Sequence, residues 1–132
     1  MASSPNVARS RGSRVRVLVA EQDADARTFY VYVLKRYGFD VYEACDSEAA
    51  NRLLTLINFD LIVLDAALPR RDGELLSDAV AERARKHDIP VVLISASDVN
   101  PARLHAQQVL RKPFQPDRLV AAVASVFAAL GE

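Results

Sequence analysis

The residues Leu61-Ile62-Val63-Leu64-Asp65 place four apolar side chains in succession before a single carboxylate. An unbroken apolar run of this length is typical of a parallel strand that is covered on both faces. A charged side chain at its carboxyl end lies at the sheet edge where open α/β sheets bind their ligands. The stretch therefore predicts a buried strand and marks Asp65 as a candidate functional residue.

Short apolar runs alternate with segments of helical periodicity on both sides of this strand. Further strands are predicted at residues 15–20, 39–44, 91–95 and 109–111. Helices are predicted from Asp23 to Gly38, from Asp46 or Ser47 to Ile57, around residues 75–80, briefly after Asn100-Pro101, and from Pro116 to Leu130. Five strand–helix repeats indicate an α/β fold: a single, doubly wound, five-stranded parallel sheet with five helices, of which the fourth is short.

The length of 132 residues suits one domain, which we place at residues 14–132. Residues 1–16 hold four of the 17 basic side chains and none of the 17 acidic ones, so they carry +4 and the remainder carries −4. We expect residues 1–13 to be a disordered, solvated basic tail that does not bind nucleic acid directly. One cysteine and the lack of a long apolar run favour a cytoplasmic protein without a membrane segment.

Polar residues follow the predicted strands at the ends where a ligand would bind. Glu21, Gln22 and Asp23 follow the first strand, Ser95 closes the fourth and Lys112 follows the fifth. If the first and third strands are neighbours, these side chains and Asp65 share one crevice. Carboxylates, a hydroxyl and an ammonium group together suit a divalent cation and a phosphoryl group. With only four scattered glycines, a nucleotide-binding P-loop is excluded.

Residues 15–130 resemble the receiver domains of bacterial two-component response regulators. The resemblance rests on Val17-Leu18-Val19 before an acidic cluster, Asp60 to Asp65, Leu68-Pro69 with Asp72-Gly73, Pro90 to Ala96, and Lys112-Pro113-Phe114. It implies the flavodoxin-like strand order 2-1-3-4-5, which makes the first and third strands neighbours.

The resemblance also implies roles for individual residues. Asp65 would be the phosphoacceptor, Ser95 the switch hydroxyl and Lys112 the phosphate-binding lysine, with Lys112-Pro113 a cis peptide. Mg²⁺ would be held by Glu21, Gln22, Asp65 and the backbone carbonyl of Ala67. The partners implied are a sensor histidine kinase or phosphotransfer protein and an unspecified downstream protein. Such a domain promotes its own phosphorylation and dephosphorylation and is not a turnover enzyme.

Three features depart from the family pattern. Gln22 is neutral where an acid is usual, so we expect weakened metal binding, unless Asp23 serves as the ligand instead. The interval from Ser95 to Lys112 is about five residues shorter than usual. Val109 replaces the aromatic residue that changes rotamer in many receivers. These features support an alternative, a pseudo-receiver that binds proteins without being phosphorylated.

A third interpretation is a small hydrolase with an aspartyl-phosphate intermediate. It lacks a second acid two residues after Asp65, because Ala67 stands there. Because the chain ends directly after the last predicted helix, we expect output by protein contact, unless the sequence is an excised piece of a longer protein.

Smaller predictions concern the tyrosines and the cysteine. Tyr30 and Tyr37 fall on the apolar face of the first helix and are predicted to be core, whereas Tyr32 should face solvent. Cys45 is expected to be a partly buried, unreactive side chain.

Overall fold

The computed structural model describes residues 14–68, 77–98 and 106–129. The predicted basic tail, the Asp72-Gly73 turn and the start of the predicted short fourth helix lie outside these residues. The described segments form β1 (Arg16–Ala20), α1 (Ala24–Arg36), β2 (Asp40–Ala44), α2 (Ser47–Leu56), β3 (Leu61–Asp65), α3 (Ser77–Lys86), β4 (Val91–Ser95), β5 (Gln108–Arg111) and α4 (Pro116–Ala129).

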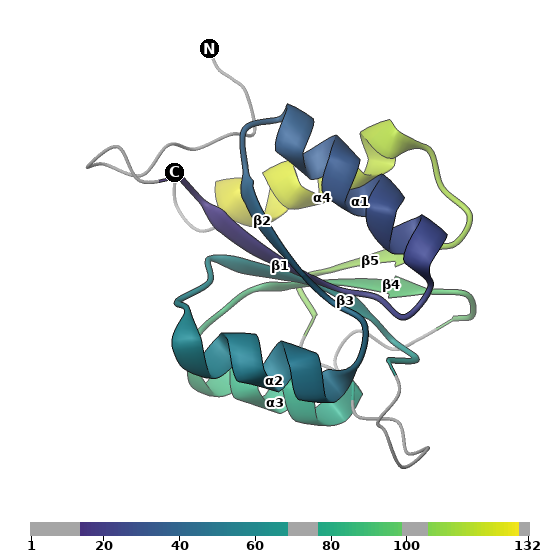
Figure 1. Cartoon of the computed structure of the whole chain (residues 1–132). Helices are drawn as coiled ribbons and strands as arrows, with labels where there is room; N and C mark the ends of the chain where they lie inside the picture. The colour runs from purple at the N-terminus through teal and green to yellow at the C-terminus, as the bar shows by residue number, and fades with distance from the viewer. Residues whose placement is uncertain (1–13, 69–76, 99–105, 130–132) are drawn as a thin grey trace.

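The five strands form one parallel sheet in the order β2-β1-β3-β4-β5. This is the flavodoxin-like order that the resemblance to receiver domains implies. In Figure 1, α1 and α4 cover one face of the sheet, and α2 and α3 cover the other. The register pairs Ala20 of β1 with Leu64 of β3, so the next residues, Glu21 and Asp65, leave neighbouring strands at the same edge.

Acidic caps and a glycine set the limits of the first two helices. The Asp23 carboxylate accepts a hydrogen bond from Ala26 N at 2.8 Å, and that of Asp46 accepts one from Ala49 N at 2.8 Å. Both satisfy backbone donors that a helix leaves free at its start. Gly38, with φ of 92°, follows the end of α1, as is usual for a residue in this conformation. No helix of the described segments is long and apolar enough to cross a bilayer.

The strands supply alternate residues to two separate cores. Val17, Val19 and Val63 pack with α1 and α4, whereas Leu18 and Ile62 pack with α2 and α3. Successive side chains of a strand point to opposite faces, so one unbroken apolar run fills both cores. This is the physical reason why β3 and β4 are buried along their whole length.

Two of the smaller predictions are wrong. Tyr30 is buried and Tyr32 is exposed, as expected, but Tyr37 is 43% exposed. Tyr37 is the C-cap of α1, so the helix that places Tyr30 in the core has ended there, although the apolar periodicity of the sequence continues. Cys45 is exposed because it directly follows β2, the edge strand, where the chain leaves the sheet.

Candidate functional site

The polar residues after four strands are held at one edge of the sheet by its backbone hydrogen bonds. The ladder continues one residue beyond the strands: Glu21 N donates to Ala44 O at 3.0 Å, and Lys112 N donates to Ser95 O at 2.8 Å. Ala66 N, directly after Asp65, donates to Ile94 O at 2.8 Å. The backbone therefore fixes where these side chains begin, as the sequence predicts from the strand ends.

Two buried carboxyl groups form the centre of this edge. Glu21 is 2% exposed and Asp65 is 6% exposed. Asp65 Oδ1 accepts a hydrogen bond from Ala67 N at 3.0 Å, and Glu21 Oε2 accepts one from Asp23 N at 3.0 Å. The two groups are close enough for the negative charge of Asp65 to act on the Glu21 carboxyl group. A buried acidic pair of this kind needs a positive charge nearby.

Lys112 supplies that charge. Its Nζ lies 3.1 Å from Glu21 Oε1, and its side chain is 28% exposed. The contact is an ion pair rather than an aligned hydrogen bond, because Glu21 Oε1 has no partner of hydrogen-bonding geometry. Lys112, which follows β5, thus forms an ion pair with the acid that follows β1.

The pKa of the Glu21 carboxyl group is raised above its ordinary value. Burial is the largest cause, and the negative charge of Asp65 acts in the same direction. The Asp23 backbone N–H and Lys112 oppose the rise. Glu21 therefore holds its negative charge at a cost, which an additional cation would relieve.

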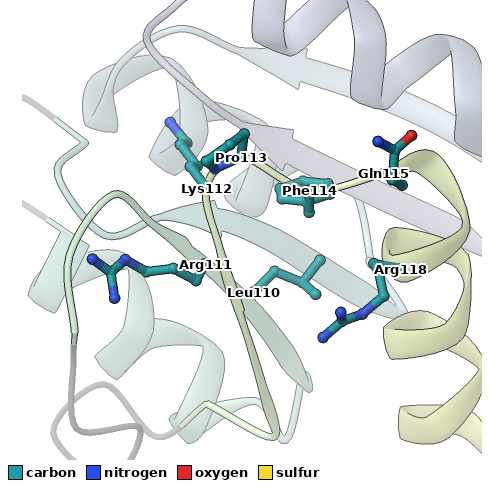
Figure 2. A pocket seen from close by; sticks show the side chains of 7 residues that line it. All are labelled: Leu110, Arg111, Lys112, Pro113, Phe114, Gln115 and Arg118. Atoms are coloured by element: carbon teal, nitrogen blue, oxygen red, sulfur yellow. The ribbon is translucent and has the colours of Figure 1, made fainter.

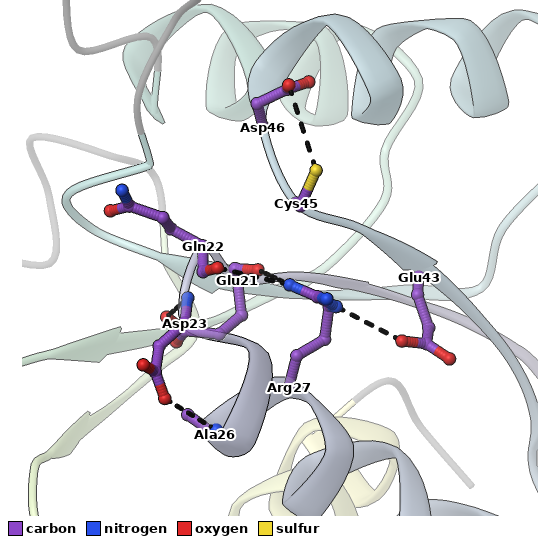
Figure 3. Close-up of polar contacts among 8 residues, drawn as sticks. All are labelled: Glu21, Gln22, Asp23, Ala26, Arg27, Glu43, Cys45 and Asp46. Atoms are coloured by element: carbon purple, nitrogen blue, oxygen red, sulfur yellow. Dashed lines mark hydrogen bonds and ion pairs between the residues drawn. The ribbon is translucent and has the colours of Figure 1, made fainter.

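Gln22 and Asp23 do not join the buried acids. Gln22 is exposed, and Figure 3 shows its side chain extending away from Arg27. Asp23 is also exposed, and its carboxylate caps α1 through Ala26 N. The acidic loop thus presents one buried carboxylate, Glu21, and two exposed polar side chains.

Arg27 shapes this loop and was not singled out in the sequence. Its Nη1 donates to Glu21 O at 2.9 Å and to Gln22 O at 3.2 Å, and its Nε donates to Glu43 Oε1 at 3.2 Å (Figure 3). These bonds tie α1 and β2 to the loop that carries Glu21. The only sequence signal for this role is the position of Arg27, a basic residue one turn into a predicted helix that follows an acidic cluster.

Tyr30 is a second residue whose place at the site was not predicted. Its ring stacks on Phe114, with centroids 5.6 Å apart and an angle of 18° between the planes. The pKa of its hydroxyl is raised by burial and by the charges of Glu21, Asp65 and Asp23, so the hydroxyl keeps its proton. Tyr30 thereby links α1 to the loop that follows Lys112.

The oxygen donors of this edge are of the kind that Mg²⁺ prefers. Two carboxylates converge, and the buried Glu21 Oε1 has no aligned hydrogen-bond donor. The described residues nevertheless contain no group of three His, Cys, Asp or Glu side chains arranged to hold a metal ion. The donor set fits a magnesium ion only with additional oxygens, for which Gln22 and the Ala67 carbonyl are the sequence candidates.

Ser95 is buried, and its hydroxyl is engaged within its own loop. Its Oγ donates to Ser97 O at 2.6 Å and accepts from Ser97 N at 3.1 Å. Arg111 of β5 joins the same loop through a bond to Ala96 O and an ion pair with Asp98. The loop after β4 is thus connected on one side to Ser95 and on the other to β5.

A cavity of about 560 Å³ lies beside Lys112, between β5 and the start of α4. Figure 2 shows Arg111, Lys112 and Arg118 extending in different directions from this segment. The Lys112-Pro113 peptide bond is cis, as the resemblance implies. The positive charge of this segment is therefore distributed around the cavity rather than concentrated at Lys112.

The fold and this set of residues define a class of protein. The family model for the response regulator receiver domain matches residues 17–124, and the chain belongs to that family. It is the receiver of a two-component response regulator.

Individual relatives agree with this assignment. The phosphate regulon transcriptional regulatory protein PhoB of Escherichia coli (strain K12) is 34% identical over 116 residues, which cover 84% of this chain and 51% of PhoB. The PhoB protein of Klebsiella pneumoniae has the same identity and coverage. The chain thus spans about half the length of the curated relatives it matches.

Solved structures give the same fold. The receiver domain of the Francisella response regulator 1452 superposes with a TM-score of 0.73 at 27% identity, covering 89% of this chain and 99% of that one. A two-component response regulator from Clostridium difficile gives a TM-score of 0.77 at 18% identity, covering 90% and 100%. At the latter identity, the likeness concerns the fold alone.

Proposed function

We propose that this receiver accepts a phosphoryl group on Asp65 from a phosphohistidine of a sensor histidine kinase or phosphotransfer protein. The single observation that supports the proposal best is the placement of Asp65. It is a buried carboxylate at the end of a buried strand, next to a second acid that is paired with Lys112. We place this domain at residues 14–132, with residues 1–13 as a tail, in a cytoplasmic protein.

The proposed reaction uses few groups. An Asp65 carboxylate oxygen attacks phosphorus, a P–O bond forms, and the N–P bond breaks as the imidazole nitrogen leaves with the bonding electron pair. Mg²⁺, when bound by Glu21, Asp65 and supplementary oxygens, would offset negative charge on the phosphoryl oxygens. Lys112 would add a second positive charge after leaving Glu21. The domain would be modified and would act through contact with a downstream protein, rather than turn over a substrate.

Ser95 is proposed as the hydroxyl that responds to phosphorylation. To donate to a phosphoryl oxygen, its Oγ must give up the bond to Ser97 O. This exchange would change the loop that Arg111 also contacts. The loop after β4 is therefore the element through which we expect the signal to pass.

Acetyl phosphate with Mg²⁺ tests the proposal directly. One phosphoryl group should be incorporated, with the alkali lability of an acyl phosphate, and Asp65→Asn should abolish it. Asp60→Asn is the matched control, because Asp60 lies just before the other end of β3 and should leave labelling intact. Persistent labelling of Asp65→Asn in a folded protein would refute the assignment.

The pseudo-receiver remains the second candidate. The observations that favour it are the exposed Gln22 and the ion pair in which Lys112 compensates the charge of Glu21. Beryllofluoride, a mimic of the phosphoryl group, separates the candidates. A receiver should bind it in the presence of Mg²⁺, whereas a pseudo-receiver should show neither this binding nor labelling by acetyl phosphate.

A further inference from the structure

A second cavity, of about 410 Å³, lies at the end of the sheet opposite Asp65. Phe59 and Ile89 line it, and each stands two residues before a strand, β3 and β4 respectively. Because all strands are parallel, residues that precede strands lie at the amino edge of the sheet, away from the carboxyl edge. A molecule bound in this cavity would not touch the proposed phosphorylation site.

The cavity has apolar walls and a positive group. Leu54, Ile57, Phe59 and Ile89 supply the apolar surface. The remaining lining residues are polar or basic, and none of the described side chains that line the cavity is acidic. Ligand sites in proteins commonly combine apolar walls with a few polar groups that fix orientation. Here the fixed charge is that of Arg83.

Arg83 is the unusual member of this lining. Its Nε is buried and has no hydrogen-bond partner. Four other arginines form ion pairs with acids: Arg16 with Asp40, Arg27 with Glu43, Arg85 with Glu82, and Arg111 with Asp98. A guanidinium group is a donor only and keeps its charge, so a buried Nε–H favours an acceptor that carries negative charge.

The neighbouring helix ends do not oppose an anion strongly. Carboxyl ends of helices repel anions through their free carbonyl groups. Here Ile57 N donates to Leu53 O, and His87 N donates to Arg83 O and Ala84 O, so several of these carbonyls already have donors. His87 also lines the cavity and lies four residues after Arg83, on the same side of the helical path.

We propose that this cavity binds a small organic carboxylate, with its apolar body against the walls and its two oxygens on Arg83. The Nε–H and an adjacent Nη–H of arginine form a fork that matches a carboxylate, after a small rotation of the side chain. A free small molecule is favoured over a protein surface because α2, α3 and the segments before β3 and β4 all contribute to the lining of one cavity, and concave sites of this kind suit small ligands. The volume lies within the range of about 300–1,000 Å³ that is common for ligand pockets. This inference does not depend on the proposed phosphorylation.

Paired probes of equal shape test it on the unaltered chain. Phenylacetate carries the carboxylate and phenylacetamide is its neutral analogue, and each is titrated into ¹⁵N-labelled protein. Phenylacetate should give saturable shifts at Phe59, Arg83 and Ile89, including the Arg83 Nε–H resonance. Phenylacetamide should bind at least about tenfold more weakly, equivalent to ~1.4 kcal/mol. Two further probes are titrated in the same way. Glutarate, which lacks the aromatic ring, tests whether the apolar body contributes to binding, and inorganic phosphate tests whether the site prefers a carboxylate to another anion.

Two variants place the effect on the proposed residue. Arg83→Gln should reduce phenylacetate affinity by about the same tenfold factor. Arg85→Gln is the matched control, because Arg85 is exposed and pairs with Glu82, and it should bind normally. Equal binding of the amide, equal binding by Arg83→Gln, binding of phosphate alone, or no saturable shift with any probe would each overturn the proposal. The two-probe comparison remains decisive if Arg83→Gln fails to fold.

Discussion

Nζ of Lys112 lies 3.1 Å from Oε1 of Glu21, so the ammonium group that follows β5 contacts the carboxylate that follows β1. Glu21 is also a proposed ligand of Mg²⁺. Under that proposal, the metal and the ammonium group would compete for one buried carboxylate. The relationship predicts how the site should respond when either partner is altered.

Lys112→Met should strengthen metal binding. Removing the ammonium takes away the cation that is paired with Glu21, so Mn²⁺, used as a paramagnetic substitute for Mg²⁺, should bind about tenfold or more tightly. Electron paramagnetic resonance of free Mn²⁺ measures this. Arg111→Met, one residue earlier and exposed, is the control and should change affinity little. Weaker binding by Lys112→Met would show that the lysine supports the metal rather than competing with it.

Glu21 should make stability depend on pH. Its pKa is raised in the folded protein, so the folded state holds this proton more firmly than the unfolded state does. The stability contribution is full below the ordinary pKa of 4.5 and is lost as pH rises through the folded pKa. The Glu21→Gln side chain has no titratable proton. The free energy of unfolding of this variant, relative to that of the wild type, should therefore increase as pH rises above 4.5.

Urea unfolding at a series of pH values measures this difference. A single group limits its slope to about 1.4 kcal/mol per pH unit. Glu43→Gln is the control, because Glu43 is exposed and lies outside the buried pair. A difference between Glu21→Gln and wild type that does not vary with pH would contradict the burial argument.

Gln22→Asp should tighten Mg²⁺ binding and speed labelling by acetyl phosphate. A third carboxylate in the acidic loop adds attraction for a hard dication, and a gain of about tenfold in affinity is expected. Gln22→Asn, which matches the size without adding charge, separates charge from side-chain length. If Gln22→Asp binds no better than Gln22→Asn, position 22 points away from the metal, and Asp23 becomes the ligand to test.

Ser95→Ala should remove the response of the loop after β4 to beryllofluoride. In the wild type, amide resonances of Ser97, Asp98 and Arg111 should shift, because the hydroxyl leaves Ser97 and Arg111 contacts the same loop. In Ser95→Ala these shifts should shrink while Mg²⁺ affinity stays nearly unchanged. Larger shifts at Val109 and along α4 than in the loop would show that the signal passes through strand β5 instead.

The sequence predicts the fold well because its decisive feature is local. The run Leu61–Asp65 and the similar run in β4 are unbroken, so their burial on both faces follows from composition alone. The starts of α1 and α2 can also be predicted from the local sequence, since Asp23 and Asp46 cap the helices that they precede. The site's location follows from the same features, because strand ends in a parallel sheet meet at one edge.

Contacts between distant side chains were beyond the sequence. The pairing of Lys112 with Glu21 joins residues far apart in the chain, and strand order alone does not choose between Glu21 and Asp65 as its partner. Arg27 was missed because its importance arises from two backbone carbonyls, which carry no mark in a sequence. Tyr37 was misplaced because periodicity continues past the residue at which the helix actually ends.

The alternation of strand residues between two cores has a consequence for the divergence of such chains. A substitution at Val17 or Val63 alters the packing of α1 and α4, whereas one at Leu18 or Ile62 alters that of α2 and α3. Two residues that are adjacent in a strand therefore pack in different cores. Compensating substitutions should pair residues that are distant in sequence on one face of the sheet, and adjacent strand positions should drift almost independently of each other.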